Sequence, residues 1–286
     1  MNQPDKLSCA LLVAGFKLRV LGAFARKISS AKSRRLLRSA ALTGLFCLAA
    51  VAVTSLRADD TMAQSTTAVE TSQLHYLNGK EPDVIALLAP PPLPDSPEQV
   101  ADMEEVRAVF HAATSNDMAA AYSEKNFSAF NFTPAIGAFF QSNNLPKTAL
   151  FFSRVQTDVA AVTDNAKDFY KRPRPYVTDP SLANGKLEKS FSYPSGHSTE
   201  SMVLALVLAD LFPDKHNAIV AEARSIGWHR VEIARHYPTD IYAGRVLAQA
   251  IVKQMEKNDD FQKDLAAAKA EISAAMPAEN NQPARR

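Results

Sequence analysis

The 286-residue sequence predicts a single all-α domain, and three observations carry this prediction. From Pro97 to about residue 275, apolar side chains recur at three- and four-residue spacing, which places them on one face of a helix. The alternation of apolar and polar residues that marks a half-buried strand is absent from this stretch. Glycine, which is common in tight turns between strands, occurs only nine times. We therefore expect helices packed around one core, without internal repeats.

Residues 1–63 have the layout of an export signal. They hold ten Lys and Arg against three acids, and the uncharged, apolar residues 39–56 follow the basic part. A positive flank, an apolar stretch and then small residues are typical of a secretory signal, with cleavage after Ala52 or, preferably, Ala63. Ser33-Arg34-Arg35 is a weak match to a twin-arginine signal. The apolar stretch is also about long enough to span a bilayer, so an uncleaved anchor is the less favoured alternative. The sequence thus predicts a periplasmic or secreted protein.

The rest of the chain is mildly acidic, because most of the basic surplus lies in the leader. It shows no basic stripe of the kind that nucleic-acid binding requires, so a nucleic-acid polymer is not an expected partner. Cys9 and Cys47 both fall within residues 1–63, so a cleaved chain would have neither a disulfide nor thiol chemistry.

Residues 64–96 are expected to form an extended N-terminal arm. The arm ends in a proline-rich stretch at residues 89–97, and consecutive prolines favour a polyproline conformation, so its simplest interpretation is a stiff connector. Ser96 is the expected N-cap of the first helix, with Pro97 at its first position. A helical domain is predicted for residues 97–276, followed by a loose tail at 277–286.

The expected helices differ in how much of their surface is apolar. Residues 201–212 are almost wholly apolar, so we expect a helix that is buried on all sides and too short to span a membrane. The others are amphipathic. They comprise a helix from Pro97 with Val100, Met103, Val106, Val109 and Phe110 on one face, a pair between residues 139 and 162 broken at Asn143–Pro146, and helices at 241–255 and 261–276.

Three short segments collect phosphate-binding and proton-transfer residues. In the first, Lys167 lies late in a predicted helix that Pro173 and Pro175 end, with Arg174 held between the two prolines. Taken alone, this segment is more simply interpreted as a basic helix end, favoured by the helix dipole.

The second segment, Tyr193 to Ser198, directly precedes the buried helix. The free N–H groups of a helix N-terminus form an anion site, Ser195 adds a hydroxyl donor, Gly196 permits a tight turn, and His197 titrates near neutral pH. The simpler alternative is a capped helix with a solvated His197.

In the third segment, Pro238 is the expected first residue of a helix, which places His236 just before it and Asp240 in its first turn. A carboxylate there can accept a hydrogen bond from one imidazole nitrogen and leave the other nucleophilic. The alternative is an ordinary first-turn acid. Arg230 opens the segment, and Glu232 and Arg235 are expected on the surface.

Together the three segments resemble the signature of the type 2 phosphatidic acid phosphatase superfamily. That signature runs Lys, six residues, Arg-Pro; then Pro-Ser-Gly-His; then Ser-Arg, five residues, His, three residues, Asp. Ten identities at roughly one in twenty each make coincidence negligible. His229 stands where the signature has Ser; we expect altered packing or leaving-group contacts there, with an extra acid as the disfavoured alternative.

Within the superfamily, residues 75–255 resemble the bacterial class A non-specific acid phosphatases, which are exported, soluble and all-α. These proteins carry a proline-rich segment near the mature N-terminus that packs on the domain, and the resemblance implies the same here. It also implies a homo-oligomer and, after signal removal, no stable membrane embedding.

The resemblance implies a metal-independent and cofactor-independent acid phosphatase acting on small phosphate monoesters, with a broad range and a phosphotransferase side activity. His236 would form a phosphohistidine, Asp240 would orient it, and His197 would serve as acid and then base. The phosphoryl oxygens would be held by Lys167, Arg174, Ser195, Gly196 and Arg230. A mildly acidic optimum follows, since His236 must be neutral while His197 is protonated.

Three other functions compete with this one. A vanadium haloperoxidase looks similar at this site, and a membrane lipid phosphatase shares the signature but needs several spanning helices. A catalytically silent phosphate-binding protein is the third, although binding alone does not need Asp240 behind His236.

Overall fold

The computed structural model describes residues 74–277; the predicted export signal, the start of the arm and all but the first residue of the predicted tail lie outside the described residues. Within this range the chain is helical and contains no strand, so the predicted all-α fold is confirmed. No helix between residues 74 and 277 is both long and apolar enough to cross a bilayer.

Ten α-helices and four 3-10 helices make up the described range. The longer helices are α2 (Pro97–Ala112), α3 (Ser115–Ser123), α5 (Pro146–Tyr170), α7 (Gly196–Leu211), α8 (His216–Glu232), α9 (Pro238–Met255) and α10 (Asp259–Ala275). The short ones are α1 (Val84–Leu87), α4 (Thr133–Ile136), α6 (Pro175–Thr178), η1 (Glu124–Asn126), η2 (Ala129–Phe132), η3 (Pro180–Leu182) and η4 (Pro213–Lys215).

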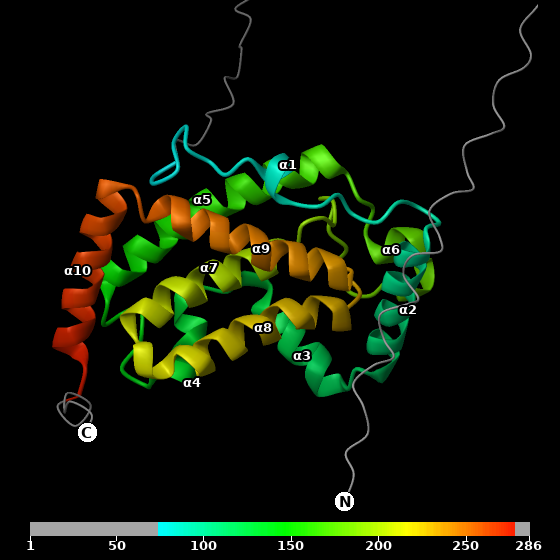
Figure 1. Cartoon of the computed structure of the whole chain (residues 1–286). Coiled ribbons are helices and arrows are strands. Elements are labelled where there is room, and N and C mark those ends of the chain that lie inside the picture. Colours follow the sequence, from blue (N-terminus) through cyan, green and yellow to red (C-terminus); the bar gives the residue numbers. More distant parts are fainter. Residues whose placement is uncertain (1–73, 278–286) are drawn as a thin grey trace, which may run out of the picture. The chain divides into compact units, whose positions relative to one another are not determined.

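Helix α7 is the centre of the fold. It packs against α5, α8 and α9, and α10 packs against α5 (Figure 1). Its residues from Ser201 to Ala205 are all buried, as the apolar pattern predicts. The helix begins at Gly196, five residues before the apolar stretch, so its N-terminus carries the Ser-Gly-His motif.

Two glycines let α8 and α9 approach the start of α7 closely. A Cβ at Gly244 of α9 would lie 2.9 Å from the Ser195 carbonyl oxygen, and one at Gly227 of α8 would lie 3.1 Å from the Ser198 hydroxyl. Real Cβ atoms do not tolerate such contacts without a shift of their neighbours. These glycines therefore bring the motif-bearing ends of three helices together.

Prolines mark most helix starts as the sequence predicts. Ser96 accepts a hydrogen bond from the Gln99 N–H at the start of α2, α5 begins at Pro146, and α9 begins at Pro238. The prediction of a helix before Asn143 was wrong. Gly137, at φ +139°, ends α4, and Phe140 closes a turn by donating its N–H to the Gly137 carbonyl.

The apolar face predicted for α2 is correct only in part. Met103 and Val106 are buried against Tyr176, Val231 and Tyr237, but Val100 is exposed.

The proline-rich segment packs on the domain. The Tyr193 hydroxyl donates to the Ala89 carbonyl at 2.6 Å, and the Tyr170 hydroxyl donates to the Leu88 carbonyl at 3.1 Å. Further upstream, the buried Asp158 carboxylate accepts three backbone N–H groups from residues 75–77. The described part of the arm therefore belongs to the same packed body as the helices.

Candidate active site

The three motif segments meet where the C-terminal end of α5, the N-termini of α7 and α9, and the C-terminal end of α8 come together. Backbone hydrogen bonds join them: Ser195 N–H to the Asp240 carbonyl at 3.1 Å, and His236 N–H to the Arg230 carbonyl at 3.2 Å. A further bond from Ser192 N–H to the Arg172 carbonyl, at 2.9 Å, joins the first and second segments. The structure thus brings all eight predicted site residues into one region.

His236 is held between a carboxylate and a guanidinium. Its Nδ1 lies 3.3 Å from Asp240 Oδ2, and its Nε2 lies 3.2 Å from Arg174 Nη1. A guanidinium can only donate, so Nε2 must accept and Nδ1 carries the proton. This tautomer leaves the lone pair of Nε2 directed away from Asp240 and toward the cationic side of the site.

Burial and charge keep this imidazole neutral. Burial, and then the charge of Arg174, lower the pKa of His236 to about 4, although the hydrogen bond and charge of Asp240 oppose them. Asp240 is fully buried, which by itself would raise its pKa. The hydrogen bond from His236 and the charge of Arg172 outweigh burial and hold the pKa of Asp240 below its ordinary value. Above about pH 4, the pair therefore consists of a neutral imidazole and a carboxylate.

Arg172 supports this pair and was missed at the sequence level. Its Nη1 lies 2.5 Å from Asp240 Oδ1 and its Nη2 lies 2.7 Å from Asp102 Oδ2, while its guanidinium lies 3.9 Å from the centre of the Tyr237 ring. Asp102 belongs to α2, 70 residues away in sequence, so no local pattern reveals the contact. Ser192, also unpredicted, donates its hydroxyl to Asp240.

Three buried cations surround the start of α7. Lys167, Arg174 and Arg230 expose at most 8% of their surface. Burial, and then the charge of Arg174, lower the pKa of Lys167, although the nearby Asp164 opposes them. The Lys167 ammonium lies 3.3 Å from where a Cβ of residue 196 would sit, so glycine leaves room for it beside the helix N-terminus. With the N–H groups of that terminus, the cations give this region the positive charge that an anion-binding site requires.

His197 differs from His236 in its partners. Its Nε2 is buried without a hydrogen bond to another protein atom, and Arg230 Nε shares this condition. Burial, and then the charges of Arg230 and His236, lower the pKa of His197 to about 3. Its ring packs near Phe127, with the ring centres 5.6 Å apart. A buried polar atom without a partner is costly, which marks these two nitrogens as places for a ligand.

His229, the departure from the signature, contacts Glu124 in η1. Its Nδ1 lies 2.8 Å from the carboxylate and its Nε2 lies 3.1 Å from the Ser225 hydroxyl. The hydrogen bond with Glu124 raises the pKa of His229. Glu124 also pairs with Arg230 Nη2 at 3.4 Å, so one buried carboxylate joins the substituted residue to a phosphate-binding candidate. Glu124 was not predicted.

Arg235 was expected on the surface, and that prediction was wrong. The side chain is buried because its guanidinium donates to the carbonyls of Ile233, Asn184 and Lys186 and lies 5.3 Å from the centre of the Tyr176 ring. Glu232 is half-buried, with one carboxylate oxygen lacking a protein partner. Arg235 thus fixes the loop of residues 183–192 over the site.

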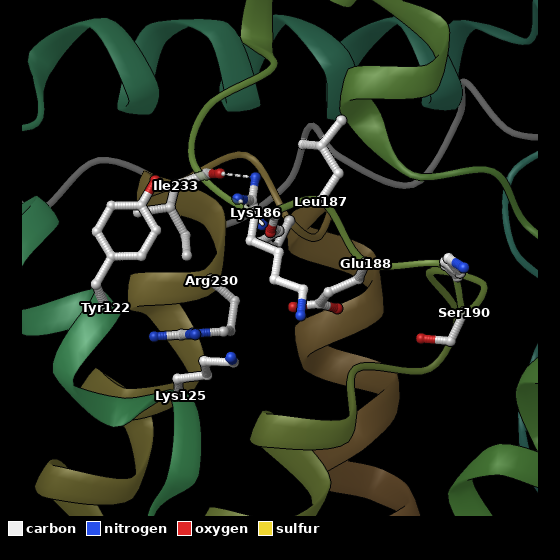
Figure 2. A pocket seen from close by; sticks show the side chains of 10 residues that line it. Tyr122, Lys125, Lys186, Leu187, Glu188, Ser190, Arg230 and Ile233 are labelled. Carbon is white, nitrogen blue, oxygen red and sulfur yellow. Dashed lines mark hydrogen bonds between the residues drawn. The ribbon is translucent and has the colours of Figure 1, made fainter.

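A cleft of about 490 Å³ opens beside Arg230 (Figure 2). Besides Arg230, it is lined by Lys125, Lys186, Lys189, Glu188 and the apolar side chains of Tyr122, Leu187 and Ile233. None of these loop and helix-end residues carries a motif, so the sequence did not point to them. In residues 74–277, no three His, Cys, Asp or Glu side chains gather as a metal site would require.

Comparison with known proteins identifies relatives of this chain. Residues 148–256, which contain all three segments, match the model of the PAP2 superfamily. The chain is 30% identical over 248 residues to a non-specific acid phosphatase of Providencia stuartii, covering 81% of this chain and 97% of that one. It is 29% identical over 202 residues to an acid phosphatase of Zymomonas mobilis, covering 68% and 76%. Among solved structures, a transmembrane PAP2-type phosphatidylglycerolphosphate phosphatase from Bacillus subtilis matches with a TM-score of 0.42 and 18% identity, over 61% of this chain and 89% of that one.

The chain belongs to the PAP2 superfamily, and within it to the family of the bacterial non-specific acid phosphatases. It is accordingly a phosphoric monoester hydrolase, as the resemblance of the three segments predicts.

Proposed function

We propose that this acid phosphatase hydrolyses small phosphate monoesters through a phosphohistidine formed on Nε2 of His236. The observation that carries the proposal is the fixed tautomer of His236: Nδ1 faces Asp240, and the lone pair of Nε2 faces Arg174. Covalent phosphoryl transfer needs a nucleophile that a second group orients, here His236 with Asp240, beside a cluster of cations.

In the first step, Nε2 forms a bond to phosphorus while the bond from phosphorus to the ester oxygen breaks. Lys167, Arg174 and Arg230 hold the equatorial oxygens, with Ser195 and the N–H of Gly196 as further donors. Asp240, balanced by Arg172, stabilises the positive charge that develops on the imidazole. Charge stabilisation and positioning dominate phosphoryl transfer, so these groups supply the positive charge that a metal ion provides in other phosphatases.

His197 gives its proton to the departing ester oxygen. Burial and nearby cations lower its pKa to about 3, so the proton must come with substrate binding. A phosphoryl dianion between Arg230 and His197 raises the pKa of His197, because it places negative charge beside the imidazolium. The proton on His197 is therefore taken up together with the phosphoryl dianion of the substrate. Because this uptake needs a proton, we expect activity to rise as the pH falls below neutrality.

In the second step, His197 as a base removes a proton from water, whose oxygen attacks phosphorus. The bond from phosphorus to Nε2 breaks, inorganic phosphate leaves and His236 is restored. An alcohol in place of water would give phosphotransferase activity, and the open cleft beside Arg230 supports a broad range of leaving groups. We also propose that the protein is exported to the periplasm or beyond and forms a homo-oligomer.

The test is p-nitrophenyl phosphate hydrolysis at mildly acidic pH with excess chelator. We expect the wild type to keep its activity and His236→Ala to lose roughly three or more orders of magnitude in kcat. His216→Ala, which removes an exposed histidine at the start of α8, is the matched control and should retain full activity. Loss of wild-type activity with chelator, or bromide oxidation by the protein with vanadate and peroxide, would contradict the proposal.

A further inference from the structure

Every nitrogen of the Arg174 guanidinium already has a partner within the protein. A guanidinium carries five N–H donors. Nε donates to the Ser190 carbonyl at 2.8 Å, and Nη2 donates to the Ser190 hydroxyl at 3.0 Å and forms an ion pair with Glu188 Oε2 at 2.5 Å. Nη1 donates to the Arg235 carbonyl at 2.9 Å and faces His236 Nε2 at 3.2 Å. A phosphoryl group can bind to Arg174 only by replacing some of these partners.

The five partners are not equally replaceable. Ser190 accepts hydrogen bonds from Nε and Nη2, and the Arg235 carbonyl accepts one from Nη1. These contacts hold the Arg174 side chain in place. The remaining edge, formed by Nη1 and Nη2, faces His236 and Glu188. A phosphoryl group beside His236 Nε2 therefore meets Arg174 at the side where the Glu188 carboxylate already forms an ion pair with Nη2.

Glu188 lies where an anion is attracted from several sides. Its backbone is fixed by Tyr176, whose hydroxyl donates to the Glu188 carbonyl at 2.8 Å and accepts its N–H at 3.2 Å. The charged and titratable groups that act on its carboxylate come from α5, the following loop, the N-terminus of α7, the end of α8 and the loop before α9; they are Lys167, Arg174, His197, Arg230 and His236. The carboxylate thus occupies part of the site that would receive phosphoryl oxygens.

We propose that Glu188 sets the affinity of the site for phosphate, because it competes with the phosphoryl group of the substrate for Nη2 of Arg174. The carboxylate must leave Arg174 when the phosphoryl group binds. Lys125, Lys186 and Lys189 line the same cleft and can receive it (Figure 2). Glu188 then weakens the binding of every phosphate dianion, product included, and favours fast release.

Protonation of Glu188 would relieve this competition only in strong acid. Burial alone would raise the pKa of Glu188, but the charges of Arg174, His236, His197 and Lys167 together outweigh it, so the pKa lies below its ordinary value. The carboxylate is therefore ionised and competes across the neutral and mildly acidic range. The competition fades only as the pH falls through this lowered pKa.

The proposal rests on the proposed function for the placement of phosphate on Arg174, but its test does not require turnover. Binding of inorganic phosphate is measured by calorimetry for the wild type, Glu188→Gln and Glu188→Ala. We expect Kd to fall roughly five-fold in both variants, the effect of a partly exposed ion pair. The ratio of the wild-type Kd to the variant Kd should stay constant from pH 5 to pH 8 and narrow only as the pH falls through the lowered pKa of Glu188. Glu256→Gln, which removes an exposed carboxylate at the end of α9, should bind phosphate as the wild type does.

Kinetics separate competition from a merely structural role. For p-nitrophenyl phosphate, competition predicts a lower KM in Glu188→Gln with kcat unchanged or higher. Unchanged or weaker phosphate binding in both variants would overturn the proposal, because Glu188 would then orient Arg174 rather than compete for it. Tighter binding in a protein that forms no phosphohistidine would instead uphold the competition and reject the mechanism on His236.

Discussion

Arg172 and Arg174 lie on either side of Pro173, and the fold gives them opposite surroundings. Arg172 faces inward, where the buried carboxylates of Asp102 and Asp240 hold it. Arg174 faces the candidate active site, where it contacts Nε2 of His236 and the half-exposed Glu188. Two residues of one segment therefore differ in role: Arg172 holds two buried carboxylates in place, and Arg174 is the one that we propose binds phosphate.

The role of a buried arginine depends on how exposed its carboxylate partners are. A buried arginine paired with equally buried carboxylates is satisfied, and its pairs hold elements together. A buried arginine whose carboxylate partner is half-exposed has a replaceable partner, because water and the nearby lysines can receive that carboxylate. Burial alone does not separate the two arginines, since both are almost fully covered.

The largest expected effect on stability comes from Arg172→Met. It leaves Asp102 and Asp240 buried without their cation, and breaking a buried ion pair in this way costs about 3–5 kcal/mol in the free energy of unfolding. Urea denaturation measures the change. Arg107→Met breaks the half-exposed pair with Asp179 and should cost less than about 1 kcal/mol. An equally small loss of unfolding free energy in Arg172→Met and Arg107→Met would show that Arg172 does not support the fold.

Arg174→Lys should affect catalysis more than stability, the reverse of Arg172→Met. Lysine keeps the charge but lacks the planar fork, so kcat/KM should fall roughly 100- to 1,000-fold, while stability should change less than in Arg172→Met. Steady-state kinetics and urea denaturation on the same samples test both statements. Near-normal kcat/KM in Arg174→Lys would remove Arg174 from phosphate binding.

A smaller, pH-dependent effect is expected from His229→Ser, which restores the residue of the family signature. Glu124 raises the pKa of His229, so the folded state binds the proton more tightly than the unfolded state does. The stabilisation of the folded state by the pair of His229 and Glu124 is therefore complete below the ordinary histidine pKa of about 6.5. It is lost as the pH rises through the raised pKa of His229. The variant should be less stable than the wild type by roughly 1 kcal/mol at pH 5 and equally stable at pH 9. A difference independent of pH would exclude the ion pair with Glu124 as its cause.

The sequence predicts the parts of the site that depend on short spacing. His236 and Asp240 face each other because they lie four residues apart across a helix start, and Pro238 marks that start. Ser195 and Gly196 lie at the N-terminus of α7 for the same kind of local reason. These contacts follow from helix geometry, which a pattern of residue types expresses directly.

The rest of the site depends on contacts between distant segments. The pairs of Arg172 with Asp102 and of Arg230 with Glu124 join residues 70 and 106 apart in sequence, and no periodic pattern reports such distances. The same holds for Arg235, which looks like a surface residue until the loop of residues 183–192 folds over it. Glu188 belongs to that loop and carries no motif, so only the structure reveals its contact with Arg174.

The most direct test of the account is to trap the covalent intermediate. The protein is mixed with substrate labelled in its phosphoryl group, quenched in alkali, where phosphohistidine is stable, and digested for peptide mapping. If His236 is the nucleophile, one labelled peptide is expected, and it contains His236. Asp240→Asn should give no label under the same quench, because that variant loses the orienting carboxylate. Label on another residue, or turnover without any trapped label at the shortest mixing times, would contradict the account.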